Sequence, residues 1–497
     1  MRYLLRPNER RQLRVVERLF YSDDWITLKE LSEELRCSIR ILKHDFSTLK
    51  STYNDFTIES SYKGYRLVFQ KNKGLKTLYN NILEHSISFR LLETIFLNEE
   101  KSIFDLADEF FISPSTLYRV VHHINEVSKA YNFQVETSPM RIVGSEKDIR
   151  FFFYQYFYEK YTRLDWPYDN VDENAIDNLL YFFIDYIDYP IEFAYFGLFK
   201  LTTFVNFIRF KNEHYIDTTD IKMNFKEVIH QFNKEVDAFK FFEKTFKIKI
   251  DDFLIQQVFT PYISENYSLT YDRLLNKLPY NKKLKKAYLC LVEILETLST
   301  KNNLPLINKE EVILDLMNAA HMEKQDPRSG YILYDRNEHF VQMIQNHFPH
   351  FYEQLNEHLK NYRKHLRLDR STTGLNFMIY ILFTRWDKLV LELRKKFKPI
   401  KILIISNRHA SHALMIKDFI EYEFSETLII DVYRDTYISK TILEELEYDL
   451  VIANFYLPQL KTKKCLYIEN LPIFSDISKI QKEFDEIITQ RNTFSIY

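Results

Sequence analysis

The sequence predicts a mainly α-helical, multidomain protein with two N-terminal winged helix-turn-helix domains, two helical bundles and a small C-terminal α/β domain. A length of 497 residues predicts three or four domains, and 46% hydrophobic with 28% charged residues is typical of a folded chain. One order of helices and a hairpin occurs twice near the N-terminus, and strands alternate with helices at the C-terminus. We expect domain boundaries at 1–72, 73–165, 166–282, 283–396 and 397–497.

The first winged module is predicted by its caps and its hairpin. Thr27 with Glu30 forms a capping box, and Ser38 caps the following helix after a short turn. Two short helices joined in this way are typical of a helix-turn-helix unit. Alternating apolar and polar residues on both sides of Lys63-Gly64 predict a hairpin, or wing. The expected helices and hairpin cover 8–21, 27–35, 39–51 and 56–69.

A second module follows with the same order of elements. Ser102 and Asp105 occupy capping-box positions, Ser113 is the next cap, and Pro114 suits the first helical position because it needs no N–H there. Two successive units of one pattern are the most specific signal in the chain. The expected elements cover 86–98, 102–110, 113–130 and the hairpin 133–143.

The rest of the chain divides into a helical region and a tail. Residues 146–397 read as helices, with one apolar stripe formed by Phe340, Ile344, Phe348, Phe351, Leu355 and Leu359. The tail alternates short apolar runs with helical patterns, which predicts a small parallel sheet covered by helices. Its strands are expected at 401–406, 427–433, 448–453 and 465–468, and its helices at 412–424 and 473–491.

The second helix of a helix-turn-helix unit lies in the major groove, so its outward residues are the candidate DNA contacts. Ile39, Leu42, Phe46 and Leu49 are expected on the opposite, core face. Residues 1–70 hold 13 Lys/Arg against 10 Asp/Glu, a local charge of +3 in a chain of −2. The alternative is a solvated helix face without a DNA role. The candidates in the first module are Ser38, Arg40, Lys43, His44, Ser47 and Lys50, with Lys63 and Arg66 in its wing.

The second module offers hydroxyls and fewer charges, so its affinity for DNA is expected to depend partly on shape and on the wings. Each wing has the alternative of being a plain surface hairpin. The candidates are Ser113, Ser115, Thr116, Tyr118, Arg119, His122 and His123, with Arg141 in the wing.

The sequence lacks the motifs that several classes of protein need for their function. The six glycines form neither a G-x-G-x-x-G motif nor a phosphate loop, and three scattered cysteines form no C-x-x-C pair. No apolar run suits a signal peptide or a membrane span, so we expect a soluble, cytoplasmic protein without membrane association. His122 and His123 point about 100° apart on a helix, so no metal site is expected there. We expect no cofactor and no metal.

This order of domains resembles the Mga/AtxA group of transcriptional regulators of Gram-positive bacteria, which are activators built around phosphotransferase-system regulation domains (PRDs) and include virulence regulators. The resemblance is carried locally by residues 28–49, 103–124, 197–209, 377–393 and 401–412. It implies that the bundles are PRD-like, that the tail resembles a phosphotransferase IIB component, and that transcription is controlled in response to sugar. It also implies homodimers or higher homo-oligomers, and phosphocarrier proteins of the phosphotransferase system as partners beside double-stranded DNA.

The chain departs from that family pattern in two places. Thr202 and Thr203 stand where a phosphorylatable PRD histidine would be sought, and Ser406 stands where a IIB component carries cysteine. The tail is therefore expected to act in interaction or dimerisation rather than to pass phosphate through a thiol. The candidate phosphorylation sites are His214, His321, His339 and His347.

An alternative function remains open: an anion- or phosphosugar-sensing α/β protein, or an enzyme, whose N-terminal helices only scaffold. Arg408, His409 and His412 near a helix start could hold an anion. Ser406 with His412 lacks a G-x-S-x-G elbow and a located acid partner, so we expect no catalysis.

Overall fold

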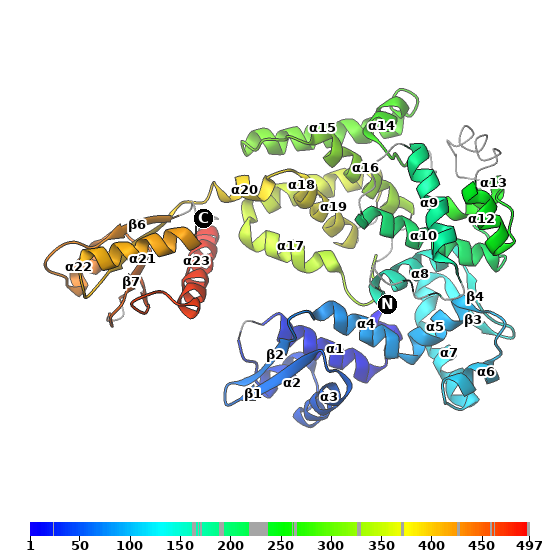
Figure 1. The fold of residues 1–497 in the computed structure, drawn as a ribbon, viewed down its shortest axis with the longest axis horizontal. Coiled ribbons are helices and arrows are strands. Elements are labelled where there is room, and N and C mark those ends of the chain that lie inside the picture. Colours follow the sequence, from blue (N-terminus) through cyan, green and yellow to red (C-terminus); the bar gives the residue numbers. More distant parts are fainter. Residues whose placement is uncertain are drawn as a thin grey trace. The chain divides into compact units, whose positions relative to one another are not determined.

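The computed structural model places the chain in two compact units, one formed by Met1–Tyr280 with Ala320–Arg336 and the other by Asn281–Ala319 with Asn337–Tyr497 (Figure 1). The structure describes residues 1–494 except 23, 162–165, 167, 169–170, 188–192, 218–236, 261, 263–265, 326–329, 369–371, 425–427, 458–459 and 462.

The first winged module has the predicted elements. The capping box predicted for Thr27 and Glu30 is present, and Ser38 caps the next helix. Gly64 opens the second wing strand at φ +133°, where a Cβ atom would lie 2.4 Å from the carbonyl oxygen of Ile26, so only glycine fits. The elements are η1 (Arg2–Leu4), α1 (Pro7–Phe20), α2 (Leu28–Leu35), α3 (Ile39–Thr52), β1 (Phe56–Ser61) and β2 (Gly64–Phe69).

The second winged module repeats this order after one helix that the sequence pattern did not predict. That helix, α4, starts after Gly74, which offers no side-chain cap. The capping box of Ser102 and Asp105 and the cap at Ser113 are both present, as predicted. The elements are α4 (Leu75–His85), α5 (Ile87–Leu97), α6 (Ile103–Glu109), α7 (Pro114–Ser128), η2 (Lys129–Tyr131), β3 (Phe133–Thr137) and β4 (Met140–Gly144).

A helical region continues the first unit. Its buried apolar side chains join those of both winged modules in one hydrophobic core, in which Phe96 stacks on Phe153 with ring centroids 4.1 Å apart. This shared core uses the many aromatic residues, which bury large areas each. The helices are α8 (Glu146–Lys160), α9 (Glu173–Ile187), α10 (Phe193–Lys211), α12 (Asp237–Phe246), α13 (Asp252–Phe259) and α14 (Tyr271–Lys277).

A later segment of the chain also packs into the first unit. The carboxylate of Glu159, whose residue is fully buried, accepts hydrogen bonds from the backbone N–H groups of Ile332 (2.5 Å) and Leu333 (2.8 Å). Tyr334 stacks on Tyr79 with centroids 4.0 Å apart. Burial raises the pKa of Glu159 to about 7, because a charge in an apolar interior is poorly solvated.

The helices of the second unit include the predicted apolar stripe, but two helices carry it. α17 ends at His347, and Pro349 begins α18, since proline cannot continue a helix yet suits its first turn. Phe348 between them is buried. The helices are α15 (Lys282–Lys301), α16 (Lys309–Gln325, shared by the two units), α17 (Arg336–His347), α18 (Pro349–Leu366), α19 (Thr372–Arg385) and α20 (Leu389–Arg394).

The tail is the predicted parallel sheet, with strand order β6-β5-β7-β8. Alternate residues of β5 point to opposite faces: Ile402 packs with α21 and α23, and Leu403 with α22. Residue 427, expected in a strand, lies outside the described residues. The elements are β5 (Ile400–Ile405), α21 (Ala410–Glu423), β6 (Leu428–Val432), α22 (Lys440–Glu445), β7 (Leu450–Ala453), β8 (Lys464–Tyr467) and α23 (Phe474–Phe494). The predicted fold class is confirmed.

Candidate nucleic-acid interface

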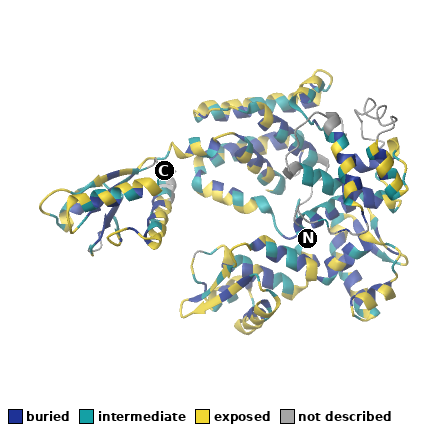
Figure 2. Cartoon of the chain, in the orientation of Figure 1, coloured by how far each residue is buried: buried dark blue, intermediate teal, exposed yellow. Residues whose placement is uncertain are grey.

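The outward face of α3 is exposed (Figure 2), and most of its exposed residues are polar or cationic. The six candidates on this helix are all exposed, namely Ser38, Arg40, Lys43, His44, Ser47 and Lys50. Arg40, Lys43 and Lys50 form no ion pair with any residue that the structure describes. Their charges therefore stay available for phosphates and for guanine O6 and N7.

The inward face of α3 differs from the expectation at one position. Leu42, Phe46 and Leu49 are buried as predicted, but Ile39 is 42% exposed, so its placement on the core face was wrong. Ile39 is in the first turn of the helix, before the first buried position at Leu42. Ile41 is exposed as well. Apolar side chains at the start of a recognition helix can contact thymine methyl groups, whereas the sequence-based candidates on this helix were all polar or charged.

A buried ion pair anchors α3 to α1. Asp45 is almost fully buried and accepts hydrogen bonds from Arg11 Nε (2.5 Å), Arg11 Nη2 (3.0 Å) and Gln12 Nε2 (3.2 Å). The hydrogen bond to Asp45 is the main reason that the pKa of Arg11 is raised, so Arg11 stays charged. This pair fixes the orientation of α3 on the rest of its module, and hence the direction of its outward face.

At the tip of the first wing, Lys63 forms no ion pair with any residue that the structure describes. Lys63 is exposed beside Tyr62, whose ring is 95% exposed. Arg66 instead pairs with Glu59 on the opposite strand (Nη2 to Oε2, 2.8 Å) and lies over the ring of Trp25. Tyr65, on the same strand, packs against Phe46. The tip, not the strands, is the part of this wing best placed to enter a groove.

The second module presents hydroxyls that bond to one another. Ser113 caps α7 by accepting from Thr116 N (3.2 Å), and its hydroxyl lies 2.9 Å from those of Ser115 and Thr116. Ser113 and Ser115 are exposed, and Thr116 is half-buried. Each hydroxyl can donate its proton to a phosphate oxygen, but two of the three protons are already engaged in these mutual hydrogen bonds.

Further along α7 the candidate residues differ in their exposure to solvent. Tyr118, Arg119 and His122 are exposed, and Arg119 Nε donates to the carbonyl oxygen of Ser115 at 3.4 Å. His123 is half-buried, and its Nε2 atom is sealed from solvent without a hydrogen-bond partner among the described residues. His123 is therefore poorly placed for a DNA contact.

The second wing repeats the cross-strand pair of the first. Arg141 Nε lies 2.7 Å from Glu136 Oε2, and the two residues stand directly opposite each other in β3 and β4. In both wings the arginine is thus held by a glutamate, and a phosphate would have to compete with that glutamate.

The two modules correspond position by position at a constant spacing. Ser102, Asp105 and Ser113 each follow Thr27, Glu30 and Ser38 by 75 residues, and all six take the same capping roles. At that spacing, three cations of the first module correspond to three exposed aromatic residues of the second: Lys29 to Phe104, Arg36 to Phe111, and Lys43 to Tyr118.

The charges of the two helix-turn-helix segments differ accordingly. Residues 27–53 hold five Lys/Arg against four Asp/Glu, a net +1, and residues 102–128 hold one arginine against four Asp/Glu, a net −3. Arg36 and Phe111 both adopt positive φ in the turn (51° and 54°), and Phe111 is 95% exposed. The backbone is repeated, but the surface is not.

The candidate histidines occupy four different environments. His214 is half-buried with Nε2 2.9 Å from both carboxylate oxygens of Glu99. His321 is buried and His339 is exposed. His347 is half-buried, with Nδ1 2.8 Å from the carbonyl oxygen of Met343.

The threonines found in place of a PRD histidine face inward. Thr203 is buried, and the hydroxyl of Thr202 donates to the carbonyl oxygen of Leu198 (2.9 Å) and lies 3.2 Å from that of Tyr262. The Thr203 hydroxyl is sealed from solvent, and the hydroxyl of the half-buried Thr202 is engaged in these contacts.

The loop after β5 holds a polar cluster around Ser406 and His412. Ser406 Oγ lies 2.8 Å from His412 Nδ1, while His412 Nε2 lies 2.7 Å from the backbone oxygen of Asn470. A carboxylate at that second nitrogen would orient a catalytic histidine, and here a backbone carbonyl takes its place.

Two structural features are absent from the described part of the chain. Within it, no helix is both long and apolar enough to cross a membrane. Over the same residues, no three His, Cys, Asp or Glu side chains gather in a way that could hold a metal ion.

Two winged helix-turn-helix modules followed by helical domains define a multidomain helix-turn-helix regulator. Residues 8–65 match the M protein trans-acting positive regulator (MGA) HTH domain, residues 71–157 the Mga helix-turn-helix domain, and residues 172–389 the MGA PRD domain. A trans-acting regulator of Streptococcus pneumoniae is 30% identical over 95% of this chain and 96% of its own length. The chain belongs to the Mga/AtxA family of trans-acting positive regulators.

More distant relatives come from Bacillus anthracis. The anthrax toxin expression trans-acting positive regulator is 21% identical over 95% of this chain and 98% of its own length. The capsule synthesis positive regulator AcpA is 24% identical over 38% of each chain.

Proposed function

We propose that this chain is a DNA-binding transcriptional activator, tuned through its PRD-like bundles by the sugar phosphotransferase system. The observation that carries the DNA-binding part is the outward face of α3, where three exposed cations have no ion-pair partner among the described residues. The two relatives from Bacillus anthracis are named as positive regulators, which supports activation rather than repression. A bacterial protein that binds the chromosome works in the cytoplasm.

DNA contact is proposed to come chiefly from the first module. α3 enters the major groove, and the tip of the first wing, with Lys63, reaches phosphate or the minor groove. The second module contributes hydroxyls, Tyr118, Arg119 and His122. A homodimer would double the phosphate contacts and read two half-sites.

Regulation is proposed to act through histidines of the helical bundles. A phosphoryl group adds about two negative charges to the imidazole that accepts it, so it can reshape a helix interface. Among the candidates, His214 and His347 are half-buried and His339 is exposed, whereas His321 is buried. Phosphocarrier proteins would be the partners in this step. We propose that the chain itself acts by binding and not by catalysis.

The direct test is a salt titration of full-length protein on a labelled random-sequence duplex. We expect the logarithm of affinity to fall linearly with the logarithm of salt concentration, because each neutralised phosphate releases about 0.9 of a counterion. Salt-independent binding, or none, would leave the alternative of an anion-sensing protein with scaffold helices. Mass spectrometry of protein incubated with phosphocarrier proteins then tests for phosphohistidine.

A further inference from the structure

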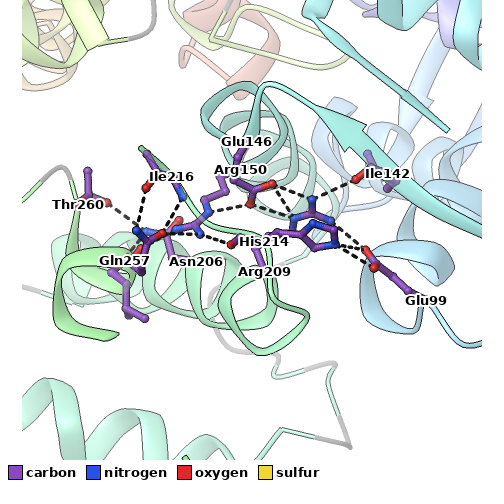
Figure 3. A network of polar contacts seen from close by, with 11 residues as sticks. Glu99, Ile142, Glu146, Arg150, Asn206, Arg209, His214, Ile216, Gln257 and Thr260 are labelled. Carbon is purple, nitrogen blue, oxygen red and sulfur yellow. Dashed lines mark hydrogen bonds and ion pairs between the residues drawn. The ribbon is translucent and has the colours of Figure 1, made fainter. Parts of the chain in front are cut away.

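A buried polar network around Arg209 joins the first helical bundle to the second winged module (Figure 3). The Arg209 side chain, on α10, is fully buried. Its Nη1 lies 3.0 Å from Glu99 Oε1, in the loop between α5 and α6. Its Nη2 donates to the carbonyl oxygen of Ile142 in β4 (3.1 Å) and to Glu146 Oε2 at the start of α8 (2.7 Å). One guanidinium group therefore contacts three separate elements.

A second arginine closes the network from the side of the bundle. Arg150 on α8 donates Nε to Glu146 Oε1 (2.9 Å), Nη1 to the carbonyl oxygen of Gln257 (2.5 Å) and Nη2 to that of His214 (2.9 Å). The side-chain amide of Gln257 on α13 in turn accepts a hydrogen bond from the backbone N–H of Ile216 and donates one to its carbonyl oxygen. The segment that carries His214 is thus fixed at its backbone on one side and by its imidazole on the other.

The charges of the network are balanced. Two arginines face two glutamates, so a neutral His214 leaves no net charge. Burial alone would raise the pKa of Glu146, but hydrogen bonds and charges of Arg209 and Arg150 hold that pKa below its ordinary value. A buried charge that loses its partner is strongly destabilised, so the network responds sharply to any change of charge.

Glu99 and His214 form the edge that reaches solvent, since their side chains are 18% and 20% exposed and that of Arg209 is 0% exposed. Oε1 of Glu99 contacts both Arg209 and His214, and Oε2 contacts His214. A positive charge at position 214 strengthens the hold on Glu99, and a negative charge repels Glu99.

We propose that the Glu99–His214 contact is a charge-controlled latch, with Arg209 as its positioning residue, through which the first bundle holds the second winged module in place. The latch needs no particular modifying enzyme, so it goes beyond the proposed function. Any event that changes the charge at position 214 shifts the freedom of β3–β4 and of the loop before α6.

The test uses full-length protein with opposite charges at one position. Hydrogen–deuterium exchange is measured by mass spectrometry for His214→Arg and His214→Glu, each alone and combined with Glu99→Gln. We expect His214→Glu to raise exchange in β3–β4 and the α5–α6 loop by about fivefold, as one charge change in a partly exposed pair allows, and His214→Arg not to raise it. Glu99→Gln should remove the difference between the two variants.

His347→Arg and His347→Glu are matched controls, because His347 is also half-buried near a helix end. They should leave exchange in β3–β4 unchanged. A merely structural role of His214 would make both of its variants loosen the wing, and that result overturns the latch. A difference that persists with Glu99→Gln overturns it too.

DNA affinity is a second readout. His214→Arg and His214→Glu should shift the affinity of the full chain in opposite directions, and affinity changes of the same sign contradict the proposal. Because exchange is measured without DNA, failure of DNA binding and failure of the latch remain distinguishable.

Discussion

The two winged modules share one backbone plan and differ in what they present to the outside. Both use hydroxyl caps 75 residues apart, and both wings hold a cross-strand Glu–Arg pair. The first exposes cations on α3 that have no ion-pair partner among the described residues, whereas the second exposes aromatic residues and is tied to the helical bundle through Arg209. Capping and packing therefore conserve a fold while the surface is free to change, and binding and control can be divided between the two copies.

The largest expected effect is on DNA affinity. Arg40→Ala with Lys43→Ala should weaken binding by about 100-fold and lower the salt slope by about 1, because a base contact and a phosphate contact are lost. The equivalent pair in the second module, Ser115→Ala with Tyr118→Ala, should cost less than about fivefold. Both are measured by salt-titrated binding to one duplex. Equal losses would contradict the proposed division of labour.

The buried ion pair of the first module comes next. Arg11→Ala should lower the local free energy of unfolding of α1–α3 by about 2 kcal/mol, because Asp45 stays buried without its cation while Arg11 itself is a quarter exposed. Asp45→Val introduces the residue type of Val120, which occupies the corresponding position of the second module, 75 residues later. This substitution should lower the free energy of unfolding by less, as apolar replacements of buried pairs often do. Native-state hydrogen exchange measures both, and a costlier Asp45→Val would refute the comparison.

Transferring the cations tests whether surface charge alone separates the modules. Phe104→Lys, Phe111→Arg and Tyr118→Lys together give the second module the residues of the first. We expect affinity for duplex DNA to rise about tenfold and the salt slope to steepen. The same three substitutions in protein that also lacks Arg40 and Lys43 should restore part of the lost affinity. No gain would mean that this face does not approach DNA.

The helix caps should behave alike in the two modules. Thr27→Ala and Ser102→Ala should each lower the local stability of the capped helix by about 1 kcal/mol, because a backbone N–H loses its acceptor. Hydrogen exchange at the first turns of α2 and α6 provides the measurement. A clear inequality would show that the match in capping geometry does not extend to energetics.

The smallest effect concerns acid. Hydrogen bonds from Thr27 and Ser102 lower the pKa of Glu30 and Asp105 below their ordinary values. A carboxyl group with a lowered folded-state pKa stabilises the fold above its unfolded pKa and loses that effect as pH falls through the folded one. Protection of both helix starts should fall in acid, and Glu30→Gln and Asp105→Asn should remove that dependence. If the pH dependence of protection is unchanged in these variants, other titrating groups must cause it.

Local chemistry made much of this fold predictable from sequence. Ser, Thr and Pro at cap positions mark the starts of α2, α3, α6 and α7, and alternation marks the wings. α4 escaped prediction because Gly74 gives no cap signal. Ile39 was misplaced because periodicity assigns a face but not where along the helix the core begins.

The candidate nucleic-acid interface could be predicted from the sequence only in part. Exposure of the α3 candidates follows from helical periodicity, but the pairing of Arg66 with Glu59 depends on strand register. The Arg209 network could not be read at all, since Arg209 and Glu99 are 110 residues apart. Such contacts depend on how whole elements pack.

Glu159 has a practical consequence for any attempt to isolate the winged pair. A fragment ending after α8 would keep this carboxylate but lose both amides that solvate it, and would uncover the apolar surface beneath Ile332 and Leu333. Because the pKa of Glu159 is already raised to about 7, its carboxylate would then take up a proton or draw in water. The isolated fragment would therefore not keep the structure that these residues have in the full-length chain. Crystallisation trials should retain the segment that contains Ile332 and Leu333, up to Arg336, or supply it as a peptide.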